Sequence, residues 1–191
     1  MFPIEAFRTT LEKIIKILRA FQIQFHLTGG VTSIAYCEPR MTQDVDIVID
    51  NDAVTRQLDS FIKSLQDSDF IFDEAALRSA VDKKQMFQLL DSVEALKLDL
   101  YPRELVPGEL DRSNTIELFD GLSVPIASLP DAAISKLVWI GKGSHKSRRD
   151  LRQMIRIATK SQRQTIDQMA ISLGLDKLLS EVLAETDEID L

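Results

Sequence analysis

The sequence predicts an α+β fold, with an N-terminal helix, a mixed α/β middle and a helical C-terminal portion. Apolar residues recur at helical spacing over residues 4–21, whereas several short segments of the middle alternate apolar and polar residues with a period of two. Everything after Leu129 has helical spacing. The 191 residues suit one domain or one domain with a small appendage. We expect an α/β domain over 1–128 and a helical region over 129–191 packed on it.

The first half of the chain contains three predicted elements around a pair of glycines. "QFHLTG" reads as a short strand that ends at Gly29 and Gly30, and "VTSIAY" as a short helix. "EPRMTQ" is an expected loop, because Pro39 disfavours helix before it. "DVDIVID" alternates with a period of two, so it is an expected strand. Its two faces carry Val45, Ile47 and Ile49 on one side and Asp44, Asp46 and Val48 on the other.

The second half of the middle region supplies further strands. Residues 53–66 predict one amphipathic helix, and residues 70–81 predict the end of a strand followed by a short helix. "QMFQLLD" and "ALKLDLYP" predict two strands, and "NTIELFDGLSVPIAS" predicts two more around the turn at Asp120–Gly121. Pro130 is expected near the start of the first C-terminal helix, a position that proline favours.

Composition describes ordinary globular material, with 45% apolar and 28% charged residues. The single cysteine, Cys37, excludes an internal disulfide and fits a reducing compartment. No apolar run approaches the ~20 residues that span a bilayer, and the N-terminus lacks the features of a signal peptide. We therefore expect a cytoplasmic protein with no membrane partner.

Charge is distributed unevenly along the chain. The net charge of −7 argues against indiscriminate binding to nucleic acid. However, the segment from Lys136 to Arg163 holds nine Lys or Arg and one acid, so it carries +8 and the remainder carries −15. This asymmetry fits either a localised anionic ligand or a solvated helix face.

Three aspartates on two expected strands form a candidate metal site. Asp44 and Asp46 lie two apart, so their carboxylates point the same way and repel unless a cation lies between them. Mg²⁺ suits this arrangement, because it binds through one or a few carboxylates plus substrate phosphates. If the strand over 95–101 pairs beside that over 44–50, Asp99 joins them. The alternative is a solvent-facing strand edge.

The glycine pair is a candidate phosphate site. Gly29 and Gly30 lie at the end of an expected strand and the start of an expected helix. Their backbone N–H groups can bind phosphate oxygens there. Thr32 and Ser33 add hydroxyl groups nearby. The alternative is that the two glycines form a tight turn and bind no phosphate.

The motifs together carry a resemblance. The chain resembles the nucleotidyltransferase superfamily of the polymerase-beta type, because it contains "LTGG", "DVDIV" and "LKLDLY" in the order of that superfamily's signature. Within it, "FHLTGGVTSIAYCEPRMTQDVDIVID" and "SKLVWIGKGSHKSRRDLRQM" resemble the bacterial branch of AbiE-type and MenA-type nucleotidyltransferase toxins. The similarity covers roughly residues 20 to 160. One departure is Cys37, where relatives often have glycine. The resemblance implies a small mixed sheet of the nucleotidyltransferase type, flanked by helices.

The resemblance also implies a reaction and its residues. The expected activity is transfer of a nucleoside monophosphate from a nucleoside triphosphate to a hydroxyl group, with Mg²⁺ or Mn²⁺ as cofactor. Asp44, Asp46 and Asp99 are the expected catalytic residues and metal ligands, with Asp99 as the base. The remaining site residues are of two kinds: nucleotide-binding Gly29, Gly30, Thr32, Ser33, Arg40 and Lys136, and, on weaker grounds, Arg148 and Arg149 toward the acceptor or a phosphate.

Several alternatives stay open. RNA, in particular a tRNA 3′ end, is the favoured acceptor, beside a protein hydroxyl or a small molecule such as an aminoglycoside. An antitoxin is an expected partner if the chain is the toxin of a pair. Arg40 either clamps a substrate or fixes its loop by pairing with Asp44 or Asp50. The rival function is a nucleotide- or partner-binding module of the same fold that does little chemistry.

Overall fold

The computed structural model describes residues 4–37 and 44–185. The chain forms two compact units. The first comprises residues 1–31 and 41–127, and the second comprises residues 32–40 and 128–191. Helix α2 (Gly29–Tyr36) begins in the first unit and continues into the second.

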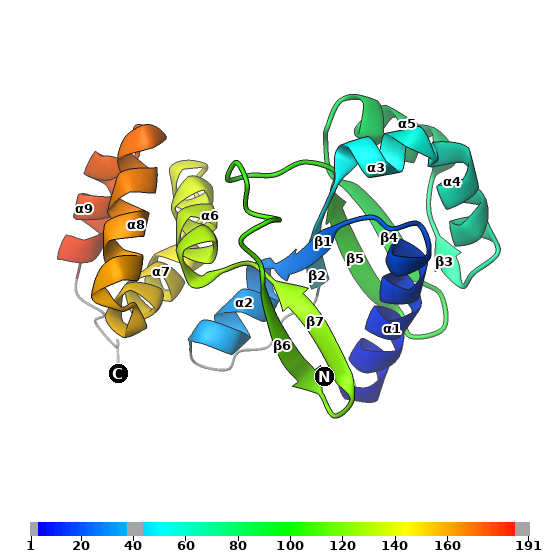
Figure 1. Ribbon diagram of the computed structural model, residues 1–191, viewed down its shortest axis with the longest axis horizontal. Helices are drawn as coiled ribbons and strands as arrows, with labels where there is room; N and C mark the ends of the chain where they lie inside the picture. The colour runs from blue at the N-terminus through cyan, green and yellow to red at the C-terminus, as the bar shows by residue number, and fades with distance from the viewer. Residues whose placement is uncertain (1–3, 38–43, 186–191) are drawn as a thin grey trace. The chain divides into compact units, whose positions relative to one another are not determined.

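A mixed sheet organises the first unit (Figure 1). Its strands lie in the order β3-β4-β5-β2-β1-β7-β6. The pairs β2–β5 and β1–β7 are parallel and the other neighbours are antiparallel. The strand bounds are β1 (Phe25–Thr28), β2 (Asp44–Ile49), β3 (Phe70–Ile71), β4 (Phe87–Asp91), β5 (Leu96–Tyr101), β6 (Asn114–Phe119) and β7 (Leu122–Ile126).

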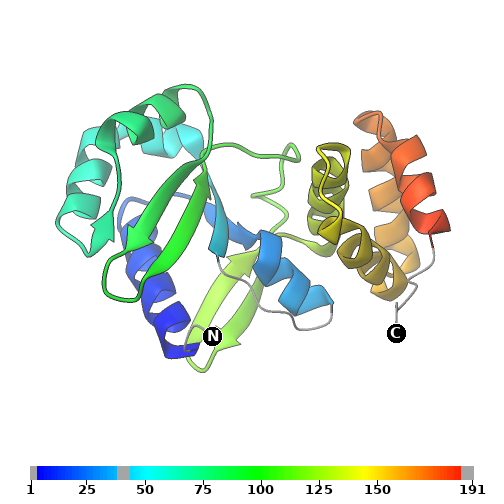
Figure 2. The same cartoon turned by 180° about the vertical axis from the view of Figure 1, so that it is seen from behind.

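The helices of the first unit are α1 (Ile4–Ala20), α3 (Asn51–Arg56), α4 (Leu58–Gln66) and α5 (Glu74–Asp82). Helix α1 lies in front of the strands in Figure 1 and behind them in Figure 2, so it covers one face of the sheet. The expected single helix over 53–66 is wrong. Gln57, at φ −136°, leaves the helical conformation and separates α3 from α4.

A buried ionic cluster fastens α1 to the strands. The side chain of Asp91, at the end of β4, is fully buried. It accepts hydrogen bonds from the Thr10 hydroxyl at 2.9 Å and from the Lys13 ammonium at 3.0 and 3.1 Å. The backbone N–H groups of Val93 and Glu94 donate to the same carboxylate. A buried charge is tolerated only when it is paired in this way.

Strand β2 confirms the alternation expected from "DVDIVID". Val45, Ile47 and Ile49 have no exposed surface, whereas Asp44 and Asp46 are partly exposed on the opposite face. Burial of the three apolar side chains in the core therefore holds the two carboxylates on one face of the sheet. The α+β fold class is confirmed.

Four helices form the described C-terminal part of the second unit, residues 128–185. They are α6 (Leu129–Gly141), α7 (Lys146–Ile157), α8 (Lys160–Ser172) and α9 (Asp176–Ala184), and α6 packs against each of the other three. Ser128 caps α6 by accepting from the N–H of Asp131, and Thr159 and Gln162 form a capping box at α8. Within the described residues, no helix combines the length and apolar character needed to cross a membrane.

Candidate active site

The parallel pair β2–β5 brings the acidic side chains together. Asp46 lies directly opposite Asp99, and Asp44 lies directly opposite Lys97. Neighbouring strands are about 4.8 Å apart, and side chains in register point to the same face. The condition set by the sequence, that the strand over 95–101 pairs beside that over 44–50, is therefore met.

Asp46 is held from three directions. The Tyr101 hydroxyl donates a hydrogen bond to its Oδ1 at 3.1 Å, and the backbone N–H of Gly30 donates to the same carboxylate. Its Oδ2 lies against Gly29, where an added Cβ would come within 1.9 Å of that oxygen. Gly29 also has φ +59°, in the left-handed region that favours glycine. The glycine is therefore required both by its backbone and by the carboxylate beside it.

Burial and the neighbouring carboxylates disfavour the charged form of Asp46. Burial raises the pKa of its carboxyl, and the charge of Asp44 and then that of Asp99 raise it further. The hydrogen bonds from Tyr101 and Gly30 act in the opposite direction. Burial and the charge of Asp46 likewise raise the pKa of the Tyr101 hydroxyl, which therefore stays a donor at neutral pH.

Asp99 and Asp44 share one cation. The Lys97 ammonium lies 3.4 Å from Asp99 Oδ2 and 3.8 Å from Asp44 Oδ2. Asp99 Oδ1 accepts from the side-chain amide of Gln88 on β4 at 3.0 Å. Both oxygens of Asp99, which is only 6% exposed, are therefore engaged.

The donor set fits a divalent metal in its chemistry. Three carboxylates share one face of two adjacent strands, and burial together with the charges of Asp44 and Asp99 raises the pKa of Asp46. Mg²⁺ needs only one or two carboxylates plus water and phosphate oxygens. Among residues 4–37 and 44–185, however, no three His, Cys, Asp or Glu side chains form a ready-made ligand group. Asp44 and Asp99 contact the Lys97 ammonium instead.

The glycine pair lies next to Asp46, which is the position expected of a phosphate site beside the metal ligands. In this structure the N–H of Gly30 donates to Asp46. Thr32 and Ser33, the hydroxyl residues of the expected site, are buried and belong to the second unit. Phosphate binding by these four residues stays a prediction.

In the second unit a buried lysine, Lys136, pairs with Asp150. Its ammonium lies 3.0 Å from Asp150 Oδ2, and the Ser33 hydroxyl donates to the same oxygen at 2.8 Å. Both members of the ion pair are nearly inaccessible, with side chains 8% and 7% exposed. The ion pair joins α6 to α7, and the Ser33 hydroxyl links both to the middle of α2, so Lys136 has a structural role within the unit whatever it does toward a nucleotide.

Arg148, expected near the acceptor or a phosphate, contacts acids of the same unit. Its guanidinium pairs with Glu181 on α9 and with Glu185, and Arg152 pairs with Glu185 at 2.6 Å. Acidic side chains therefore offset part of the charge of the basic segment. Arg149 is exposed on α7. Arg40 lies outside the described residues.

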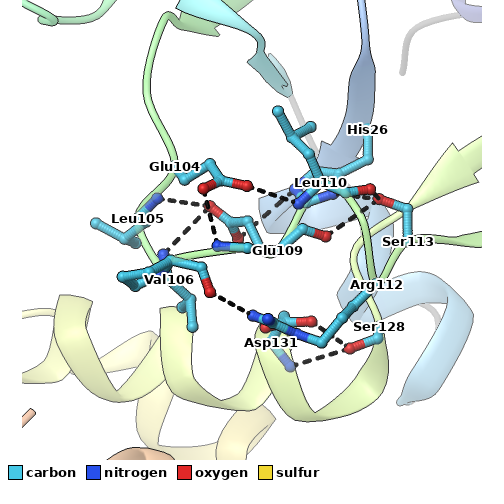
Figure 3. Close-up of polar contacts among 12 residues, drawn as sticks. His26, Glu104, Leu105, Val106, Glu109, Leu110, Arg112, Ser113, Ser128 and Asp131 are labelled. Atoms are coloured by element: carbon cyan, nitrogen blue, oxygen red, sulfur yellow. Dashed lines mark hydrogen bonds and ion pairs between the residues drawn. The ribbon is translucent and has the colours of Figure 1, made fainter. Parts of the chain in front are cut away.

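His26 on β1 belongs to the scaffold near the site. Its Nδ1 lies 2.8 Å from the Ser113 hydroxyl, and its Nε2 lies 3.6 Å from Glu109 Oε2. Glu109 in turn accepts from the backbone N–H groups of Leu105 and Val106 (Figure 3). These contacts hold the 104–113 loop against the strand.

A cavity of about 490 Å³ opens elsewhere in the first unit. It lies at the far end of β2 from Asp44 and contains none of the expected site residues. Its lining residues are Gln24, Ile49, Asp50, Asn51, Asp52, Lys84, Arg103, Glu104, Pro107, Leu110 and Asp111. The candidate site is therefore defined by the acids and glycines and not by this cavity.

Lys97, Tyr101 and Gln88 are site residues that the sequence analysis did not single out. Lys97 and Tyr101 lie two residues on either side of Asp99, so strand alternation alone places them on its face. The spacing of two residues from Asp99 is therefore a signal that the sequence carries for both side chains. Gln88 required the register of β4 against β5, which the sequence does not state.

Comparisons with known proteins give the class and the family. The family model described as "Nucleotidyl transferase AbiEii toxin, Type IV TA system" matches residues 16–180. The chain is therefore a nucleotidyltransferase. It belongs to the AbiEii nucleotidyl transferase toxin family. None of the curated proteins matches it.

Three solved structures are similar to the chain. A crystal structure of an antigenic nucleotidyltransferase-like protein from Paracoccidioides brasiliensis has 19% identity and a TM-score of 0.48, covering 91% of this chain and 90% of that one. The solution structure of the antibiotic-resistance factor ANT(2'')-Ia has 13% identity and a TM-score of 0.49, covering 96% and 91%. The lincosamide antibiotic adenylyltransferase LnuA, lincomycin-bound, has 16% identity and a TM-score of 0.46, covering 78% and 96%.

Proposed function

We propose that this nucleotidyltransferase transfers a nucleoside monophosphate from a nucleoside triphosphate to an acceptor hydroxyl, using Mg²⁺ or Mn²⁺. The acceptor oxygen bonds to the α-phosphorus, the bond from that phosphorus to the pyrophosphate oxygen breaks, and pyrophosphate leaves. One observation carries the proposal: Asp46 lies opposite Asp99, two residues after Asp44 and directly against Gly29. Acids and glycines far apart in the sequence thus adjoin within one unit.

Each acid has a proposed role. Asp44, Asp46 and Asp99 would hold the metal ion, which when bound would neutralise charge on the carboxylates and on the triphosphate. Asp99 takes the proton of the acceptor hydroxyl. Gly29 and Gly30, at the start of α2, offer backbone N–H groups to the nucleotide's phosphates beside Asp46. Tyr101 holds the Asp46 carboxylate in place through its hydroxyl.

RNA, with a tRNA 3′ end as the first choice, is the proposed acceptor. Its support is the basic segment from Lys136 to Arg163, which could contact the RNA backbone. The pairing of Arg148 and Arg152 with glutamates reduces the charge available for that contact. Protein hydroxyls and small molecules are the alternatives. As the toxin of a type IV pair, the chain would be opposed by an antitoxin.

The test is a transfer assay with each of the four α-labelled triphosphates, Mg²⁺ or Mn²⁺, and tRNA, protein and small-molecule acceptors. We expect label on tRNA from one or more triphosphates and none in EDTA. Asp46→Asn and Asp99→Asn should each lower transfer about 100-fold or more. Asp120→Asn, at the turn between β6 and β7, removes the same charge elsewhere in the unit and should leave transfer unchanged.

The rival function, a binding module, predicts different results. It would give tight Mg²⁺–nucleotide binding in calorimetry with no labelled product on any acceptor. Transfer undiminished by Asp46→Asn would also overturn the proposal.

A further inference from the structure

Lys97 is a half-exposed lysine between two of the proposed metal ligands. Its ammonium lies 3.8 Å from Asp44 Oδ2 and 3.4 Å from Asp99 Oδ2, and 41% of its side chain is exposed. Strand geometry sets this placement, because Lys97 is in register with Asp44 and two residues before Asp99 on the same face. The contact is therefore built into the sheet.

A protonated lysine and a metal ion cannot both be held there favourably. The ammonium has donors only and no lone pair, so it cannot become a ligand, and its charge repels a dication. Without a metal, the same charge offsets part of the repulsion among Asp44, Asp46 and Asp99. The flexible four-carbon stem of lysine allows the ammonium to leave while its backbone stays in the strand.

We propose that Lys97 is a built-in counter-ion that stabilises the metal-free acids and competes with the divalent metal for Asp44 and Asp99. The inference rests on the proposed function for the identity of the metal ligands. It adds a positioning residue that sets the affinity of the site for metal. Lys97 thereby makes metal binding weaker than three carboxylates alone would give.

The experiment measures Mn²⁺ binding without nucleotide or acceptor, by the loss of the free-ion signal in electron paramagnetic resonance. Lys97→Met should bind Mn²⁺ about five- to tenfold more tightly than the wild type, because a competing unit charge has gone. Lys97→Arg, which keeps the charge, should stay within about twofold. Lys63→Met on α4 removes a lysine that contacts Asp67 instead, and should not change the affinity.

A second readout follows thermal unfolding in EDTA. Lys97→Met should unfold at a lower temperature than the wild type, and saturating Mn²⁺ should raise its Tm by more than it raises that of the wild type. If Lys97→Met does not fold, Lys97→Gln serves in both measurements.

Two outcomes would overturn the inference. One is a Lys97→Met or Lys97→Gln affinity equal to or weaker than that of the wild type, and the other is no Mn²⁺ binding by either protein. Failure of nucleotide transfer is a separate result, since no substrate is present here. A protein that binds Mn²⁺ more tightly after Lys97→Met but transfers nothing would sink the proposed function and leave this inference standing.

Discussion

The carboxylate of Asp46 fills the space that a side chain at position 29 would occupy, so Gly29 and Asp46 depend on each other. An added Cβ at Gly29 would lie 1.9 Å from Asp46 Oδ2, and the backbone there has φ +59°. The glycine pair is thus part of the acid site even before any phosphate is considered.

Gly29→Ala should therefore displace Asp46 as well as strain the backbone. We expect a loss of about 2–4 kcal/mol in the free energy of unfolding, together with a large loss of nucleotide transfer. The matched control is Gly121→Ala, at φ +76° with no other atom within 4 Å of the added Cβ. It should cost only about 1 kcal/mol and keep transfer. Urea unfolding compares the two, and equal costs with full activity in both would contradict the dependence.

Asp46→Asn should make the metal-free protein more stable while removing its activity. Burial and the charges of Asp44 and Asp99 raise the pKa of Asp46 in the folded state. The stability associated with its protonated form is therefore present below the unfolded value of about 3.9 and lost as pH rises through the folded pKa. At pH 7 the asparagine avoids this loss, and Tm in EDTA should rise by roughly 2–4 °C. Asp120→Asn is the control, and a lower Tm for Asp46→Asn would contradict the prediction.

Asp91→Asn should weaken the attachment of α1 to the sheet. It should also make the stability of the protein depend less on pH at acidic pH. Burial alone would raise the pKa of Asp91, but hydrogen bonds from Lys13, Thr10 and the N–H groups of Glu94 and Val93 outweigh it and lower the pKa. Its contribution is thus present above the unfolded value of about 3.9 and lost as pH falls through the folded pKa.

We expect Asp91→Asn to cost about 2 kcal/mol at pH 7, because the hydrogen bonds to a charged carboxylate are lost while Lys13 keeps Asp69 at 2.9 Å. Below pH 4 the difference from the wild type should shrink, as measured by Tm from pH 2.5 to 7. Asp59→Asn removes an acid that is 87% exposed and pairs with Arg78, and it should change little at any pH. A constant gap between Asp91→Asn and the wild type would contradict this account.

Lys136→Met should destabilise the second unit, because it leaves the carboxylate of Asp150 buried without its ammonium. The expected cost is about 3 kcal/mol, and the double variant Lys136→Met/Asp150→Asn should recover part of it. Lys142→Met, an exposed lysine just after the same helix, is the matched control. If Lys136→Met unfolds like the wild type but raises KM for the triphosphate, the lysine acts on the nucleotide and not on the scaffold.

The sequence by itself determined most of the helices and strands and the strand faces on which the three acids lie. Alternation in "DVDIVID" and "LKLDLY" gave two strands with Asp44, Asp46 and Asp99 on defined faces, since a strand has a fixed period of two. Helical spacing likewise predicted α1 and the C-terminal helices. It did not predict the break at Gln57, because apolar spacing continues on both sides of it and only the backbone shows the interruption.

Tertiary structure alone decided which side chains meet. The parallel register of β2 against β5 sets Asp46 opposite Asp99 and Lys97 opposite Asp44, and a shift of one residue would have turned the acids to the other face. The sequence spacing of Ser33, Lys136 and Asp150 likewise gives no sign that Lys136 and Asp150 form a buried ion pair to which Ser33 donates a hydrogen bond. Such contacts depend on strand pairing and helix packing between segments far apart in the chain, where local periodicity carries no information.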